Sequence, residues 1–172
     1  MKKLLFLMLL VFVNTVSFSQ VNQSNKIDLR LLENFIVHKI NEYRINNGVD
    51  TLIINDTIKS ISNIECQYIC DNGLIQNPNT MDNLKNFYGD KIYYSFNSNI
   101  VTKWSLSKID DWDDVENRMA EGYITQYTLD KTESTILVSK KEIDKDFKEY
   151  IGVTCKIKDN IIYVSQVIYI TK

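Results

Sequence analysis

The chain contains one histidine, His38, so any site that needs an imidazole must use this residue. A Ser/His/Asp triad, a Cys/His pair and an imidazole-based zinc site all share that requirement. His38 falls on a helical pattern, about half a turn from the apolar positions Ile36 and Ile40. No serine or cysteine in a recognisable nucleophile context accompanies it. The sequence therefore favours a surface or partly packed histidine over a catalytic one.

Carboxylates offer two other kinds of chemistry. Four acids close together in the sequence could bind calcium through their oxygens: Asp110, Asp111, Asp113 and Asp114. They lack the spacing and the glycine of a dedicated calcium loop, and acids favour the first turn of a helix, so capping and solvation are the preferred interpretation. A carboxylate pair could also cleave a glycosidic bond, but separation in space decides such pairs. Nothing singles out one pair among the 22 acids.

The three cysteines are predicted to pack rather than react. Cys66 and Cys70 lie one helical turn apart, a spacing that suits a disulfide poorly, so Cys155 with either of them would make the better bridge. Three buried thiols remain the favoured interpretation. Ser62 continues the four-residue spacing and completes a narrow stripe of small side chains, along which another backbone can approach the helix closely.

Five aromatic residues could line a groove for a ligand, although core packing is the favoured interpretation of their role. Its members lie in and after an irregular segment: Tyr88, Tyr93, Tyr94, Phe96 and Trp104.

Composition and charge limit the class of protein. The chain has 172 residues, 44% of them hydrophobic, which suits about one globular domain. Residues 1–20 combine Lys2 and Lys3 with a short apolar run and small residues, the pattern of a secretory signal peptide. The remainder carries 18 basic and 22 acidic side chains, a charge of 18 − 22 = −4, without the basic stripe that nucleic acid requires. We expect a secreted or periplasmic protein that has no membrane anchor in its mature chain and does not bind nucleic acid.

Hydrophobic periodicity then predicts the elements of one domain over residues 28–172, after a polar leader at 21–27. Asp28 is expected to cap a helix that ends at Gly48. A short extended piece over residues 51–54 follows, and Asn55 or Asp56 is expected to cap a second helix over residues 57–71. Residues 76–90 are predicted to form a loop with at most one brief helical turn, and residues 91–103 an interrupted strand or a strand followed by a loop. A third helix follows the four acids, and alternation over residues 151–170 predicts an antiparallel hairpin.

Short motifs along residues 28–170 connect this order of elements to a known family. They are Ile40, Asn41 and Arg44 in the first helix, Asn55 and Ile58 with the small-residue stripe in the second, and Tyr150–Val153 and Tyr163–Val167 in the closing strands. Together they resemble the CAP superfamily of cysteine-rich secretory, antigen five and pathogenesis-related proteins, also called the SCP-like extracellular domain. The resemblance implies helices on both faces of a sheet and a cleft in which two histidines and two acids can hold a divalent metal.

Both cleft histidines are missing from this chain. Gln76 and Asn77 stand where relatives carry serine and histidine, and the second family histidine would fall within residues 132–139, which contain none. The family's Gly-Glu-Asn-Ile motif resembles residues 97–100, with its acid lost. Glu116 or Glu121 can supply the remaining acid, but one carboxylate rarely makes a tight metal site. We therefore expect no metal and no cofactor.

These observations predict an α/β fold, specifically a three-layer α-β-α sandwich with a mainly antiparallel central sheet. The predicted function is noncatalytic binding of an extracellular or envelope lipid, glycan or protein, in a remnant cleft formed by Asn77, Ser98, Asn99 and Glu116. One alternative is a hydrolase that uses carboxylates alone, which requires two acids within about 10 Å and a raised pKa on one of them. Another is a structural or inhibitory protein that acts through an apolar surface patch.

Overall fold

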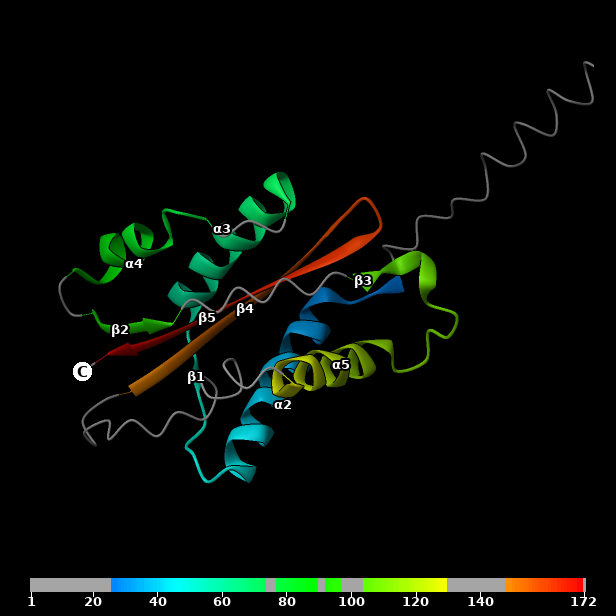
Figure 1. Cartoon of the computed structure of the whole chain (residues 1–172), viewed down its shortest axis with the longest axis horizontal. Helices are drawn as coiled ribbons and strands as arrows, with labels where there is room; N and C mark the ends of the chain where they lie inside the picture. Colours follow the sequence, from blue (N-terminus) through cyan, green and yellow to red (C-terminus); the bar gives the residue numbers. More distant parts are fainter. Residues whose placement is uncertain (1–25, 74–76, 90–91, 97–103, 130–147, 172) are drawn as a thin grey trace, which may run out of the picture.

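The computed structural model describes residues 26–73, 77–89, 92–96, 104–129 and 148–171 (Figure 1). The predicted signal peptide, residues 21–25 of the leader and the segment 132–139 lie outside this part of the chain. The main helices are α2 (Leu29–Asn46), α3 (Asp56–Asn72), α4 (Thr80–Tyr88) and α5 (Val115–Leu129), with a 3-10 turn η3 (Leu106–Lys108). The strands are β1 (Ile53–Ile54), β2 (Ile92–Phe96), β3 (Trp104–Ser105), β4 (Lys148–Lys158) and β5 (Ile161–Thr171).

Helix α2 begins and ends where the sequence predicts. The Asp28 carboxylate accepts hydrogen bonds from the backbone N–H groups of Arg30 and Leu31, which satisfies two of the free donors at a helix start. At the other end Gly48 adopts a φ of 69°, a left-handed conformation that glycine reaches without strain. Between them, α2 buries an apolar stripe that includes Leu32, Ile36 and Ile40. The predicted helix is confirmed.

Helix α3 lies against the sheet along its stripe of small side chains, as predicted. The Ser62 hydroxyl donates to the carbonyl oxygen of Ser165 at 2.8 Å, and the Cys66 thiol contacts that of Tyr163 at 3.5 Å. Gly152 of β4 faces the same helix, and a Cβ built there would lie only 2.4 Å from the carbonyl carbon of Ile58. Small side chains on both elements therefore let helix and sheet come together closely.

The five strands form one mixed sheet in the order β1-β4-β5-β2, with β3 also paired to β5. β4 and β5 make the predicted antiparallel hairpin, joined by Asp159 and Asn160 at φ values of 52° and 58°. β1, however, runs parallel to β4, so the α/β class is confirmed but the expected mainly antiparallel sheet is wrong. The parallel pairing arises because the N–H of Asn55 donates to the carbonyl oxygen of Ile151, which aligns the chain before α3 with β4.

Side chains of the hairpin alternate between two faces, and helices cover both. On one face Ile151, Val153 and Val164 pack with α2 and α5. On the other face Val167 and Tyr169 pack with α3 and α4. Figure 1 shows α2 and α5 side by side, away from α3. The sheet therefore separates the α2–α5 side of the molecule from the α3–α4 side.

The structure contains a helix, α4, where the sequence predicts a loop, so that prediction is wrong. Asn-rich residues 76–90 include nine helical residues, because Leu84 is fully buried and Tyr88 stacks on Tyr169 with ring centroids 4.5 Å apart. The Thr80 hydroxyl also donates to the carbonyl oxygen of Asn77 at the helix start. Contacts with distant residues thus stabilise a helix that its local composition disfavours.

Two polar residues of α2 fix the chain that follows it. The Asn41 amide both donates to and accepts from the backbone of Leu52, at 3.2 and 2.8 Å. Arg44 is 1% exposed, donates to the carbonyl oxygen of Asp50 at 2.7 Å and pairs with the carboxylate of Glu149 on β4. Burial lowers the pKa of Arg44 below its usual value. Both residues hold the connection to β1 against the sheet.

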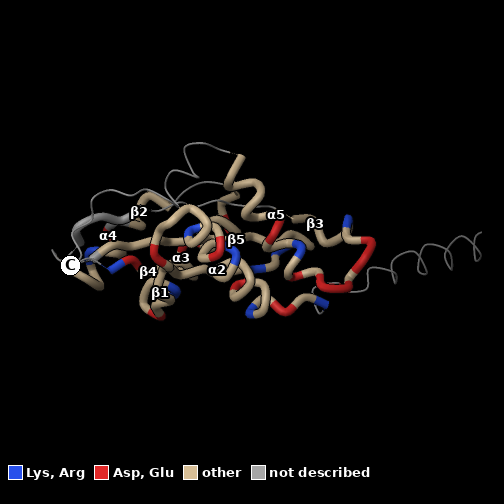
Figure 2. The backbone as a smooth tube through the Cα atoms, turned by 90° about the horizontal axis from the view of Figure 1, so that it is seen from below, with Lys and Arg blue, Asp and Glu red and all other residues tan. Residues whose placement is uncertain are grey.

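The described start of the chain also contacts the domain. Ile27 is buried in the α2–α5 core, and the Lys26 ammonium lies 4.9 Å from the centre of the Trp112 ring. Basic and acidic residues are interspersed along the described backbone, with acids concentrated in the loop before α5 (Figure 2). No helix within the described ranges has the length and apolar character needed to cross a bilayer.

Candidate functional site

Asn77, the first residue of the predicted cleft, is buried beside α3 at the start of α4. Its amide nitrogen donates to the Glu65 carboxylate at 3.2 Å, and its amide oxygen accepts from the backbone N–H of Asn79 at 3.0 Å. Asn77 is 8% exposed and Glu65 is fully buried. The side chain of Asn77 is therefore committed to the junction between the two helices.

Glu116, another residue of the predicted cleft, lies on the other side of the sheet. It belongs to the first turn of α5, and its carboxylate accepts a hydrogen bond from the backbone N–H of Asp28 at 2.8 Å. The structure thus places Asn77 and Glu116 on opposite faces and does not bring them together in one cavity. Ser98 and Asn99 lie outside the described residues.

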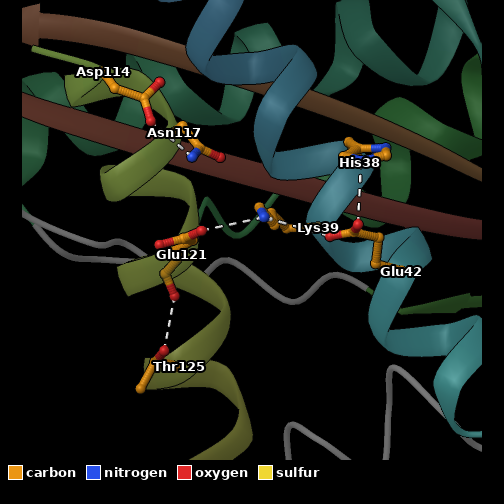
Figure 3. A network of polar contacts seen from close by, with 7 residues as sticks. All are labelled: His38, Lys39, Glu42, Asp114, Asn117, Glu121 and Thr125. Carbon is orange, nitrogen blue, oxygen red and sulfur yellow. Dashed lines mark hydrogen bonds and ion pairs between the residues drawn. The ribbon is translucent and has the colours of Figure 1, made fainter.

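His38 belongs to a surface network between α2 and α5 (Figure 3). Its Nε2 lies 3.4 Å from Glu42, and its side chain is 65% exposed. The neighbouring Lys39 lies between Glu42 and Glu121, at 3.5 and 3.3 Å, and the hydrogen bond to Glu121 raises the pKa of Lys39. The network joins two helices at the surface, so the interpretation of His38 as a surface residue is confirmed.

The acids before α5 are used locally. Asp111 pairs with Arg118 and accepts from the backbone N–H of Asp113 at 2.9 Å, while Arg118 also donates to the Asp111 carbonyl oxygen at 2.6 Å. The hydrogen bond from Arg118 holds the pKa of Asp111 below its usual 3.8. Asp114 accepts from the Asn117 amide at 3.0 Å. In the described ranges, no group of three or more His, Cys, Asp and Glu side chains could hold a metal ion.

A cavity of about 510 Å³ opens between the β3–η3 segment and α5. Its apolar lining is formed by Trp104, Ile109, Val115 and Met119. The size falls within the range of about 300–1,000 Å³ that is typical of small-molecule sites. We call this cavity the α5 pocket.

Trp104 is supported from behind by a buried polar chain. Its ring meets that of Tyr123 edge-on, with centroids 6.4 Å apart. The Tyr123 hydroxyl donates to the Gln166 side-chain oxygen at 2.9 Å, and the Gln166 amide donates to the Tyr127 hydroxyl at 3.0 Å. Tyr123, Tyr127 and Gln166 are fully buried, so this part of the pocket wall is held by the core.

Gly122 also lines the α5 pocket and has no structural explanation elsewhere. It lies in the middle of α5, where glycine is about 0.5–1 kcal/mol less favourable than alanine. Its φ is not positive, and a Cβ at this position would meet nothing within 4 Å. Neither backbone conformation nor close packing requires glycine here. What its missing side chain does provide is open space beside the pocket.

Four charged side chains complete the pocket lining: Lys108, Asp110, Asp111 and Arg118. Arg118 and Asp111 pair with each other as described above. The side chains of Lys108 and Asp110 are exposed, and neither side chain makes a hydrogen bond or ion pair with another residue in the described ranges. The pocket thus combines an apolar wall with one ion pair and two further charged side chains, one positive and one negative, that have no partner among the described residues.

Groups suited to catalysis are scarce among the described residues. The three cysteines are free and buried, in agreement with the favoured prediction, and burial raises the pKa of Cys66, Cys70 and Cys155. These thiols stay protonated near neutral pH and make poor nucleophiles. Hydrogen bonds lower the pKa of Asp71 and that of Asp111, whereas a carboxylic acid that donates a proton in hydrolysis has a raised pKa.

Comparison with known proteins adds no assignment. The sequence matches no protein-family model, and no curated protein is significantly similar to it. The fold and the pocket therefore define the molecule only as an α/β protein with a small-molecule-sized cavity.

Some residues of this pocket carry a signal in the sequence, but nothing in the sequence indicates that they form one site. Trp104 was a candidate groove residue, and Asp110 and Asp111 belonged to the acidic cluster. Lys108 and Arg118 gave no signal, because single basic residues on exposed turns and helices are common. Gly122 did give a weak one, since a glycine within a helical pattern costs about 1 kcal/mol relative to alanine.

Proposed function

We propose that this protein is a secreted, noncatalytic binding module of the CAP kind, and that the α5 pocket holds its extracellular or envelope ligand. The observation that carries the proposal is the pocket itself, whose apolar wall includes Trp104, packed on the buried Tyr123, and whose lining includes Gly122, beside which space is open. A helix interior that accepts an unfavourable glycine at the cavity wall indicates that the open space is useful.

The layering supports the same proposal. Helices α2 and α5 on one face and α3 on the other correspond to the three-layer sandwich that the CAP resemblance implies. Protonated thiols and a solvent-exposed histidine favour binding over turnover. Secretion and the family assignment rest on the sequence patterns alone.

The test uses the indole N–H signals of Trp104 and Trp112 in a ¹⁵N NMR spectrum, assigned with the Trp112→Phe variant. Trp112 packs with Lys26 and is not part of the pocket lining, so it serves as an internal reference. Three probes represent the three ligand classes: dodecylphosphocholine below its micelle concentration, N,N′-diacetylchitobiose, and the dipeptide Leu-Leu. We expect at least one probe to shift the Trp104 signal and to leave that of Trp112 in place.

Gly122→Leu should weaken that binding by at least about tenfold, because Gly122 lines the pocket, an added Cβ there has open space around it, and a leucine side chain would compete with the ligand for that space. Thr125→Leu, which adds the same side chain to an exposed position of α5, is the matched control and should bind normally. A Trp104 signal that no probe moves, or equal binding by Gly122→Leu, would overturn the proposal. Cleavage of a bound probe would overturn its noncatalytic part.

A further inference from the structure

We infer that the α5 pocket selects a zwitterionic ligand with an apolar body, namely a short peptide with free amino and carboxyl ends. This inference rests on the proposed binding function and specifies the chemistry of the ligand. Its basis is the pair of charged side chains that line the pocket without a partner among the described residues, Lys108 and Asp110.

The charges of the lining favour a zwitterion because they balance. Lys108 and Arg118 are positive, Asp110 and Asp111 are negative, and the Arg118–Asp111 pair is already satisfied. A purely anionic ligand would gain attraction from Lys108 and repulsion from Asp110, and a cationic ligand the reverse. A neutral sugar would leave both without an ionic partner. A molecule with one amino group and one carboxylate can pair with each of them.

The apolar wall supplies the rest of the recognition. Trp104, Ile109, Val115 and Met119 offer aromatic and aliphatic surface for the ligand's side chains. Met119 adds an adaptable thioether, a group that suits binding of varied apolar side chains. The cavity of about 510 Å³ accommodates a short peptide but not a folded chain.

Four forms of one dipeptide separate the contributions of its ends. They are Leu-Leu, its N-acetyl derivative, its C-terminal amide, and the doubly blocked N-acetyl amide, each titrated against the Trp104 indole signal. Exposed ion pairs are weak, so blocking either end should lower the affinity by about two- to fivefold, and blocking both should multiply the losses. Leu-Leu itself should bind most tightly.

Two substitutions assign each end of the peptide to its residue. In Asp110→Asn the penalty for N-acetylation should vanish while the penalty for amidation persists. In Lys108→Gln the penalty for amidation should vanish while the penalty for N-acetylation persists. Both residues are exposed, so circular dichroism should show an unchanged fold.

Four results would contradict the inference, and they bear differently on the proposed function. Equal affinities for all four peptides, abolished together by Gly122→Leu, would leave a pocket that binds through apolar contact alone. Penalties that persist unchanged in both charge variants would place the ionic contacts elsewhere. Binding of diacetylchitobiose without any peptide binding would refute zwitterion selection. Binding of dodecylphosphocholine, which is itself zwitterionic, without any peptide binding would refute the assignment to a peptide. Either result would still support the binding function itself.

Discussion

Gly152→Ala offers the sharpest test of how α3 packs on the sheet. A Cβ at position 152 would lie 2.4 Å from the carbonyl carbon of Ile58 and from the backbone nitrogen of Lys59. Ordinary contact begins at 3.4 Å, so the helix and β4 would have to separate by about 1 Å (3.4 minus 2.4). These atoms belong to the helix backbone and cannot rotate away as a flexible side chain could.

The expected loss of stability follows from what that separation would break. Overpacking of a tight interface costs about 1–3 kcal/mol. The hydrogen bond from Ser62 to the carbonyl oxygen of Ser165, 2.8 Å long and buried, would also stretch, and a buried group left without its partner costs about 1–3 kcal/mol. Because the two effects overlap, we expect a decrease of about 3 kcal/mol in the free energy of unfolding.

Urea denaturation followed by far-UV circular dichroism measures this change directly. Gly122→Ala is the matched control, because the same methyl group is added where nothing lies within 4 Å. It should raise the free energy of unfolding by about 0.5–1 kcal/mol, since alanine is the better helix former. The two substitutions should therefore act in opposite directions. A loss below about 1 kcal/mol for Gly152→Ala, with an unchanged denaturant slope, would show that the helix is not held at this distance.

Three further predictions concern buried and charged groups. Arg44→Ala should lower the free energy of unfolding by about 3–5 kcal/mol in the same urea assay, because it leaves Glu149 without its cation, and an unchanged midpoint would contradict this. At pH 8 the three buried thiols should react with Ellman's reagent far more slowly in the native protein than in urea, since burial raises their pKa values, whereas a fast native reaction would mean they are accessible. The lowered pKa of Asp111 stabilises the fold above pH 3.8, and this contribution is lost as the pH falls through the lower folded value, so the stability difference between wild type and Asp111→Asn should shrink toward zero in that window. A difference independent of pH would exclude the ion pair with Arg118 as its cause.

Local signals were enough to predict α2, α3 and the β4–β5 hairpin. Asp28, Asn55 and Gly48 act at the helix ends through their own side chain or conformational freedom, so their types carry the information. The extended piece over residues 51–54, which contains β1, was also predicted, but helix α4 and the parallel pairing of β1 with β4 could not be predicted in this way. Leu84 stabilises α4 only once the distant β5 is in place, and the two residues of β1 are too few to show any alternation.

The candidate site was harder to predict for a related reason. Asn77 and Glu116 were grouped through a resemblance in sequence order, but the sheet separates them, and no local pattern shows which face of a sheet a residue reaches. The α5 pocket combines residues from β3, η3 and α5 whose side chains meet only in the folded chain. Gly122 was visible in the sequence, yet its meaning depended on knowing that its helix neighbours a cavity.

The motif residues that resemble the CAP superfamily make structural contacts in this chain, and none of these contacts involves a reactive cleft. Asn41 fixes the backbone of Leu52, Arg44 ties α2 to β4, Asn55 caps α3, and Gly152 lets α3 approach the sheet. Each of these interactions remains intact whether or not histidines stand elsewhere. These contacts would therefore hold the described elements together even in a chain of the CAP kind that lacks both cleft imidazoles, and such a chain could bind a ligand at another surface. For this reason, resemblance in these motifs bears on the fold, while the function has to be tested at the α5 pocket.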